Sequence, residues 1–151
     1  MEKKVKKQIF SINYHKKISN KLKKYLNKNF LTDKKIEKIL ITGSFLKNKL
    51  GKYEKYLGKK YDRTYSDIDL VLIVKNGFVI RKRWKLLAKR PYYKVYRLGY
   101  LVEKKIPVEA VILNKRFLKN KKAVALCEKK GIPMKLEKSR INYVDFLKEQ
   151  S

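Results

Sequence analysis

The sequence is short of negatively charged side chains. Its 151 residues include 13 Asp and Glu against 42 Lys and Arg, which gives a formal net charge of +29 at pH 7. A surface this basic attracts polyanions, and nucleic acid is the commonest of these in a cell, ahead of an anionic membrane surface. A nucleic-acid partner is therefore predicted.

Cysteine, histidine and long apolar runs are also scarce. The lone Cys127 cannot form an intramolecular disulfide, so nothing in the chain indicates an oxidising compartment. The only histidine, His15, lies among lysines and is predicted to be a surface side chain, with no second histidine to build a metal site. No apolar stretch approaches the roughly 20 residues of a membrane span, and no secretory-type run follows the basic N-terminus. We therefore expect a cytoplasmic protein with no membrane partner.

Glycine and proline are few, at six and three, and no stretch rich in them divides the chain. Hydrophobic residues make up 44%, which is ordinary for a globular protein. A single domain over residues 1–151 is predicted, and it is large enough to bury a core. Two additions to this domain are expected: a basic, tyrosine-rich insert at 51–65 and a short C-terminal helical extension at 139–151.

Hydrophobic periodicity predicts the order of the elements. Apolar residues spaced by three and four predict helices over 13–29, 79–89, 92–105 and 117–130, with a short helical segment over 45–50. Apolar runs predict strands over 36–42, 66–74, 106–113 and 132–136. The fold class is therefore α/β, or α+β, with a small mixed β-sheet and helices packed on it.

Two of the scarce carboxylates lie inside the predicted strand over 66–74. Asp67 and Asp69 are separated by one residue, so both project from the same face of a strand. Carboxylates so close together repel one another unless they are protonated or bridged by a cation. Mg²⁺ is the natural bridge, because it takes oxygen ligands and keeps positions for water and substrate phosphates. The pair is therefore predicted to hold metal.

A third carboxylate, Glu109, lies in the middle of the apolar run IPVEAVIL over 106–113. If that strand lies beside the strand of Asp67 and Asp69, the three acids converge on one site. The structural alternative stays open: Asp67 can be a turn acid, and Asp69 and Glu109 can form buried ion pairs with the abundant cations.

The first predicted strand, over 36–42, runs directly into Gly43-Ser44. Glycine allows a sharp turn and a close approach of the backbone to a ligand. The free amides at the start of a following helix, together with the Ser44 hydroxyl, favour phosphate. Lys47 and Lys49 are further, unspecific phosphate contacts, and an ordinary turn is the alternative.

Taken in order, a strand, Gly43-Ser44, a spacer, Asp67-x-Asp69 and a later Glu109 resemble the DNA polymerase β-type nucleotidyltransferase superfamily, and most nearly in size its minimal members. The likeness covers roughly residues 36–136. It implies a metal-dependent enzyme that transfers a nucleoside monophosphate from a triphosphate such as ATP to a hydroxyl and releases pyrophosphate. It also implies two Mg²⁺ ions, or Mn²⁺, on Asp67, Asp69 and Glu109, with the triphosphate held by Gly43 and Ser44.

The chain departs from the family pattern in three ways. The spacer of 22 residues, 45 to 66, is longer than usual, and the third acid is Glu where Asp is typical. The Tyr-Phe-Thr-Gly segment of family X polymerases and a helix-hairpin-helix motif are both missing from the sequence. A gap-filling polymerase is therefore disfavoured.

The long spacer combines aromatic and cationic side chains, which suits stacking on bases and attraction to phosphates. Its predicted nucleic-acid contacts are Tyr53, Tyr56, Lys59, Lys60, Tyr61 and Arg63. A solvated loop is the alternative. The expected acceptor is thus nucleic acid, including an RNA 3′ end. Two other hypotheses are an antitoxin-like enzyme that modifies a protein hydroxyl and a non-catalytic nucleic-acid-binding module.

Overall fold

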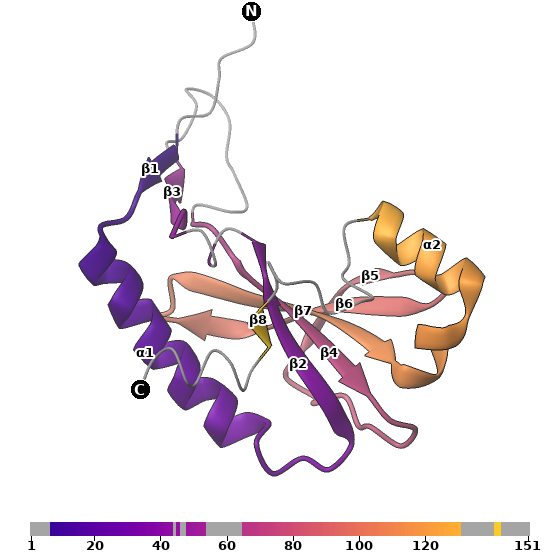
Figure 1. Ribbon diagram of the computed structural model, residues 1–151. Coiled ribbons are helices and arrows are strands. Elements are labelled where there is room, and N and C mark those ends of the chain that lie inside the picture. Colours follow the sequence, from indigo (N-terminus) through magenta and orange to yellow (C-terminus); the bar gives the residue numbers. More distant parts are fainter. Residues whose placement is uncertain (1–6, 44, 46–47, 54–64, 131–140, 143–151) are drawn as a thin grey trace, which may run out of the picture.

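A mixed β-sheet forms the centre of the protein (Figure 1). The computed structural model describes residues 7–43, 45, 48–53, 65–130 and 141–142. Within these ranges the sheet has six strands in the order β5-β6-β7-β4-β2-β8, and β1 and β3 form a separate two-stranded sheet. The elements are β1 (Lys7–Ile9), α1 (Ile12–Asn29), β2 (Ile36–Thr42), β3 (Gly51–Tyr53), β4 (Ile68–Val74), β5 (Lys85–Lys89), β6 (Tyr93–Leu101), β7 (Ile106–Asn114), the 3₁₀ helix η2 (Lys115–Lys119), α2 (Lys121–Lys129) and β8 (Ile141–Asn142). The predicted mixed α/β architecture is confirmed.

Helix α1 covers one face of the sheet (Figure 1). It begins after Ser11, whose side chain accepts a hydrogen bond from the Tyr14 amide and so satisfies one free donor of the first turn. Ile18, Leu22 and Leu26 recur every four residues and are fully buried against the sheet. The helix predicted over 13–29 is therefore confirmed. No helix in the described ranges is long and apolar enough to cross a membrane.

The opposite face of the sheet has its own, smaller core. Val71 and Ile73 of β4 pack there with Leu113 of β7 and with Cys127 of α2. Cys127 is fully buried, and this burial raises the pKa of its thiol. Since β4 and β7 contribute alternate residues to both cores, the two strands are covered on both sides. The predicted strands over 36–42 and 106–113 are present, and the strand predicted from residue 66 begins at Ile68.

The helices predicted over 79–89 and 92–105 are wrong, because these segments form β5 and the antiparallel strand β6. Strand β6 contains a bulge between Arg97 and Gly99 in its pairing with β7. The extra residue brings Leu98 and Leu101 into the same core, although they are three positions apart. Apolar residues three positions apart on one face are typical of a helix. The bulge therefore hid the alternation of every second residue that a regular strand shows.

A single arginine anchors the segment that leads into β5. The Arg81 guanidinium lies within 5.8 Å of the ring centroids of Phe30, Phe78 and Trp84. It also pairs with Asp33 at 2.7 Å. Burial acts to raise the pKa of Asp33, but the hydrogen bonds and charges of Arg81 and Lys35 together outweigh it, so the pKa lies below its usual value. These contacts hold residues 75–84 against the end of α1 in a non-helical conformation.

The C-terminal elements differ in part from prediction. The helix expected over 117–130 is divided, since η2 ends at Lys119 and α2 begins after Asn120, whose side chain caps the Ala123 amide at 3.1 Å. The expected helical extension over 139–151 is a strand at Ile141–Asn142, which pairs with β2. The rest of that extension and the strand expected over 132–136 lie outside the described residues.

His15 is buried, at 2% exposure, which corrects the prediction of a surface side chain. Its Nε2 accepts a hydrogen bond from the Leu50 amide at 3.0 Å, and its Nδ1 lies 2.9 Å from the Ser11 carbonyl oxygen. Because an amide can only donate, Nε2 carries no proton and Nδ1 donates to Ser11. The neighbouring lysines misled the sequence analysis, since His15 lies three residues before Ile18 on the buried face of α1.

We expect His15→Ala to lower the free energy of unfolding by roughly 1–3 kcal/mol, because the buried Leu50 amide loses its acceptor. Lys16→Ala, on the exposed side of the same helical turn, is the control and should change stability by about 0.5 kcal/mol or less. Urea denaturation followed by circular dichroism measures both variants. Equal losses in the two variants would contradict the assigned hydrogen bond.

Candidate active site

Four polar side chains form one row across the sheet. They are Thr42 on β2, Asp69 on β4, Glu109 on β7 and Arg97 on β6. Each is the direct cross-strand partner of the next, and residues paired in this way project from the same face. The residues that alternate with them on β4 and β7 pack beneath α1, so the row lies on the face opposite that helix.

Asp69 and Glu109 are neighbours on the parallel strands β4 and β7. Adjacent strands are about 4.8 Å apart. Glu109 is only 7% exposed, and Asp69 is partly buried. Carboxylates this close, shielded from water, require either protonation or a compensating positive charge. A shared site was predicted on the condition that the strand of Glu109 lies beside that of Asp69. The pairing of β4 with β7 meets this condition for these two acids.

Arg97 supplies positive charge beside Glu109. Its Nη2 lies 3.9 Å from Glu109 Oε2, which is long for an ion pair, and its Nη1 donates to Tyr100 Oη at 3.2 Å. Its Nε is buried and has no hydrogen-bond partner within the described residues. Arg97 was not predicted from the sequence, because it lies in the segment mistaken for a helix. An arginine between Tyr96 and Leu98 in an apolar run was the available signal.

Gly43 brings the turn after β2 against the Asp69 carboxylate. Its φ of +82° is unfavourable for other residues, and a Cβ atom at this position would lie 2.6 Å from Asp69 Oδ2. Thr42 approaches the same residue, with its Oγ1 3.5 Å from the Asp69 carbonyl oxygen. The glycine turn and one predicted acid therefore lie side by side.

Asp67 is partly exposed and lies one residue before β4 begins. The preceding Ser66 fixes this point of the chain, because it exchanges two hydrogen bonds with Gly51 of β3. Its Oγ accepts from the Gly51 amide at 3.0 Å, and its own amide donates to the Gly51 carbonyl at 2.9 Å. The start of β4 is therefore held firmly next to the small sheet.

The donor chemistry of the site suits a hard cation, since Asp69 and Glu109 offer carboxylate oxygens on adjacent strands. Across the residues that the structure describes, no three His, Cys, Asp or Glu side chains gather closely enough to form a metal-binding group. The structure places Asp69 and Glu109 on adjacent strands, and all three acids, Asp67 included, stay predicted metal ligands.

Several predicted contacts lie outside the described residues. They are Ser44, Lys47, Tyr56, Lys59, Lys60, Tyr61 and Arg63. Tyr53 belongs to β3, and its side chain is likewise not described. Lys49 is exposed beside Asn48, whose φ of +53° marks a turn before the buried Leu50. The predicted nucleotide-binding and nucleic-acid-binding sets thus stay predictions.

No protein-family model, curated protein or solved structure matches this chain. The interpretation of the site therefore depends on its own geometry. That geometry consists of two in-register carboxylates, an arginine beside one of them and a glycine turn against the other.

Gly43→Ala should destabilise the protein more than Gly77→Ala, although both glycines have positive φ values of similar size. At Gly77 a new methyl group would meet only the flexible end of Lys35 at 3.5 Å, so the cost should be about 1–2 kcal/mol from the backbone alone. At Gly43 the Asp69 carboxylate must also move, which adds roughly 1–3 kcal/mol. Thermal or urea unfolding of the two variants tests this difference, and identical losses would show that Asp69 does not abut the turn.

Proposed function

We propose that this chain is a metal-dependent nucleotidyltransferase acting on a nucleic-acid hydroxyl. The observation that carries the proposal is the in-register pairing of Asp69 with Glu109, with the Gly43 turn directly against the Asp69 carboxylate. An acidic pair beside a glycine turn suits a triphosphate accompanied by divalent ions. It is also the arrangement that the motif order in the sequence implies.

The residues of the site have two roles in this proposal, metal binding and triphosphate binding. Asp69 and Glu109, with Asp67, would hold Mg²⁺ or Mn²⁺, and Gly43 and Ser44 would approach the triphosphate through their backbone. A bound divalent ion supplies positive charge against the phosphates and favours the ionised form of the attacking hydroxyl.

Arg97 acts as a positioning residue in the same proposal. Its ion pair with Glu109 limits the movement of that side chain, and its charge offsets part of the carboxylate repulsion.

The reaction forms a bond between the acceptor oxygen and the α-phosphorus of the triphosphate. The bond from that phosphorus to the bridging oxygen breaks, and pyrophosphate leaves with the electron pair. The proton of the acceptor hydroxyl passes to a carboxylate oxygen of the site. The net charge of +29 favours nucleic acid as the acceptor, because a protein acceptor does not require so basic a surface.

A nucleic-acid-binding module without transfer activity is the second candidate. The Arg97–Glu109 ion pair favours it, because the row can then be a buried charge balance that stabilises the sheet. In that case the acids would contribute to folding only, and the basic surface would account for the whole function.

Incubation with Mg²⁺, labelled nucleoside triphosphates and a mixed pool of RNA and DNA separates these proposals. We expect label on nucleic acid with the wild type and a loss of roughly 100-fold or more in Asp69→Asn, since a ligand is lost without a change of shape. The control is Glu103→Gln, an exposed acid in the turn between β6 and β7, which should transfer at the wild-type rate.

Substantial transfer by Asp69→Asn would refute the metal assignment. Label that appears only on a co-purified protein would assign a protein acceptor. No transfer by the wild type, with nucleic-acid binding intact, would favour the binding module.

A further inference from the structure

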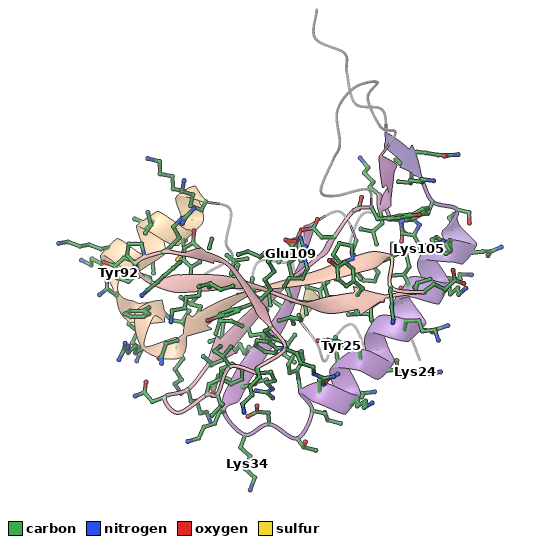
Figure 2. All side chains as sticks on the ribbon, turned by 180° about the vertical axis from the view of Figure 1, so that it is seen from behind. Lys24, Tyr25, Lys34, Tyr92, Lys105 and Glu109 are labelled. Atoms are coloured by element: carbon green, nitrogen blue, oxygen red, sulfur yellow. The ribbon has the colours of Figure 1, made fainter. Side chains whose placement is uncertain are left out.

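A cavity of about 400 Å³ opens at the carboxyl end of β4 and β7. Its lining includes Val74 and Asn114, which are the last residues of these strands and pair with each other. Asp69 lies five residues before Val74, or roughly 16 Å along the strand. Figure 2 shows Tyr92, which lines the cavity, near α2 and well apart from Glu109. The cavity is therefore separate from the candidate active site.

Cationic side chains line this cavity, and none of the described residues in its lining carries a carboxylate. The cations are Lys75, Lys89, Arg90, Lys94 and Arg116. Lys75 pairs with Glu37 at 3.5 Å, whereas the other four make no ion pair with any residue that the structure describes. Their uncompensated charge favours an anionic ligand.

Aromatic rings form part of the same wall. The rings of Tyr92 and Phe117 meet edge to face, with centroids 5.2 Å apart, and both side chains are partly exposed. The Arg116 guanidinium lies 4.8 Å from the Phe117 ring centroid, so positive charge and an aromatic surface adjoin. Asn76 and Asn114 also line the cavity, and Asn114 Nδ2 donates a hydrogen bond to Asn76 Oδ1 at 2.8 Å. Their side-chain amides can form hydrogen bonds with the edge of a base.

We propose that this cavity binds one nucleotide unit of a single-stranded nucleic acid. The base stacks on the Tyr92 and Phe117 wall, and Lys94 and Arg116 bind its phosphates. Stacking and phosphate contact together are how proteins hold single strands without reading sequence. A volume of about 400 Å³ is within the usual range for a small-ligand site. The inference concerns binding alone and does not depend on the transfer reaction.

The test is fluorescence anisotropy with a short fluorescein-labelled single-stranded RNA, without metal or triphosphate. Lys94→Glu/Arg116→Glu is compared with Lys24→Glu/Lys105→Glu, a control that changes the net charge equally at exposed positions away from the cavity (Figure 2). We expect the cavity variant to raise the Kd by about tenfold more than the control does. Circular dichroism confirms that both variants are folded. Equal increases would show that binding follows net charge alone and would overturn the proposal.

Tyr92→Leu tests the stacking contact at constant charge. It should raise the Kd for RNA by roughly fivefold or more, and leave competition by inorganic tripolyphosphate unchanged. An unchanged Kd for RNA would overturn the proposal.

Competition with ATP then identifies the source of the nucleotide. If ATP displaces the RNA, and if Tyr92→Leu weakens this displacement, the cavity is assigned to free nucleotides. Displacement only by unlabelled RNA would assign it to a strand. Because no metal or triphosphate substrate enters the RNA titration, failure of the transfer reaction cannot be confused with failure of this site.

Discussion

Two carboxylates on adjacent parallel strands impose the strongest constraint on this fold. The pairing of β4 with β7 sets Asp69 beside Glu109 in a sheet that is covered on both faces. Their mutual repulsion must be offset. On one side β6 places Arg97 against Glu109, and on the other β2 ends at the glycine turn against Asp69. The order of the four central strands is therefore what assembles the candidate site.

The segments that could be predicted from sequence are those with a clear apolar period. Helix α1 and strands β2, β4 and β7 follow from it. The direct contact between the glycine turn and Asp69 does not, because it depends on the pairing of β2 with β4. Arg97 could not be placed, because the bulge in β6 gives Leu98 and Leu101 a helical spacing. His15 was misplaced because its lysine neighbours suggested a surface, whereas its position on the helix face decides its burial. In both cases tertiary context outweighed local composition.

The two ends of β4 and β7 differ in charge. The acids lie near the beginning of these strands, and the basic, aromatic cavity lies beyond their carboxyl ends. A polyanion would be drawn to the cavity and repelled by the negative charge of the carboxylates, unless divalent ions offset that charge. Under the proposed function, metal binding and nucleic-acid binding would therefore favour each other.

Thermal unfolding in the presence and absence of Mg²⁺ tests the central claim most directly, because it needs neither acceptor nor triphosphate. A ligand that binds only the folded state raises the Tm with its concentration. We predict that millimolar Mg²⁺ raises the wild-type Tm by a few degrees and leaves that of Asp69→Asn unchanged. No shift in the wild type, or the same shift in both proteins, would contradict a metal site formed by Asp69 and Glu109.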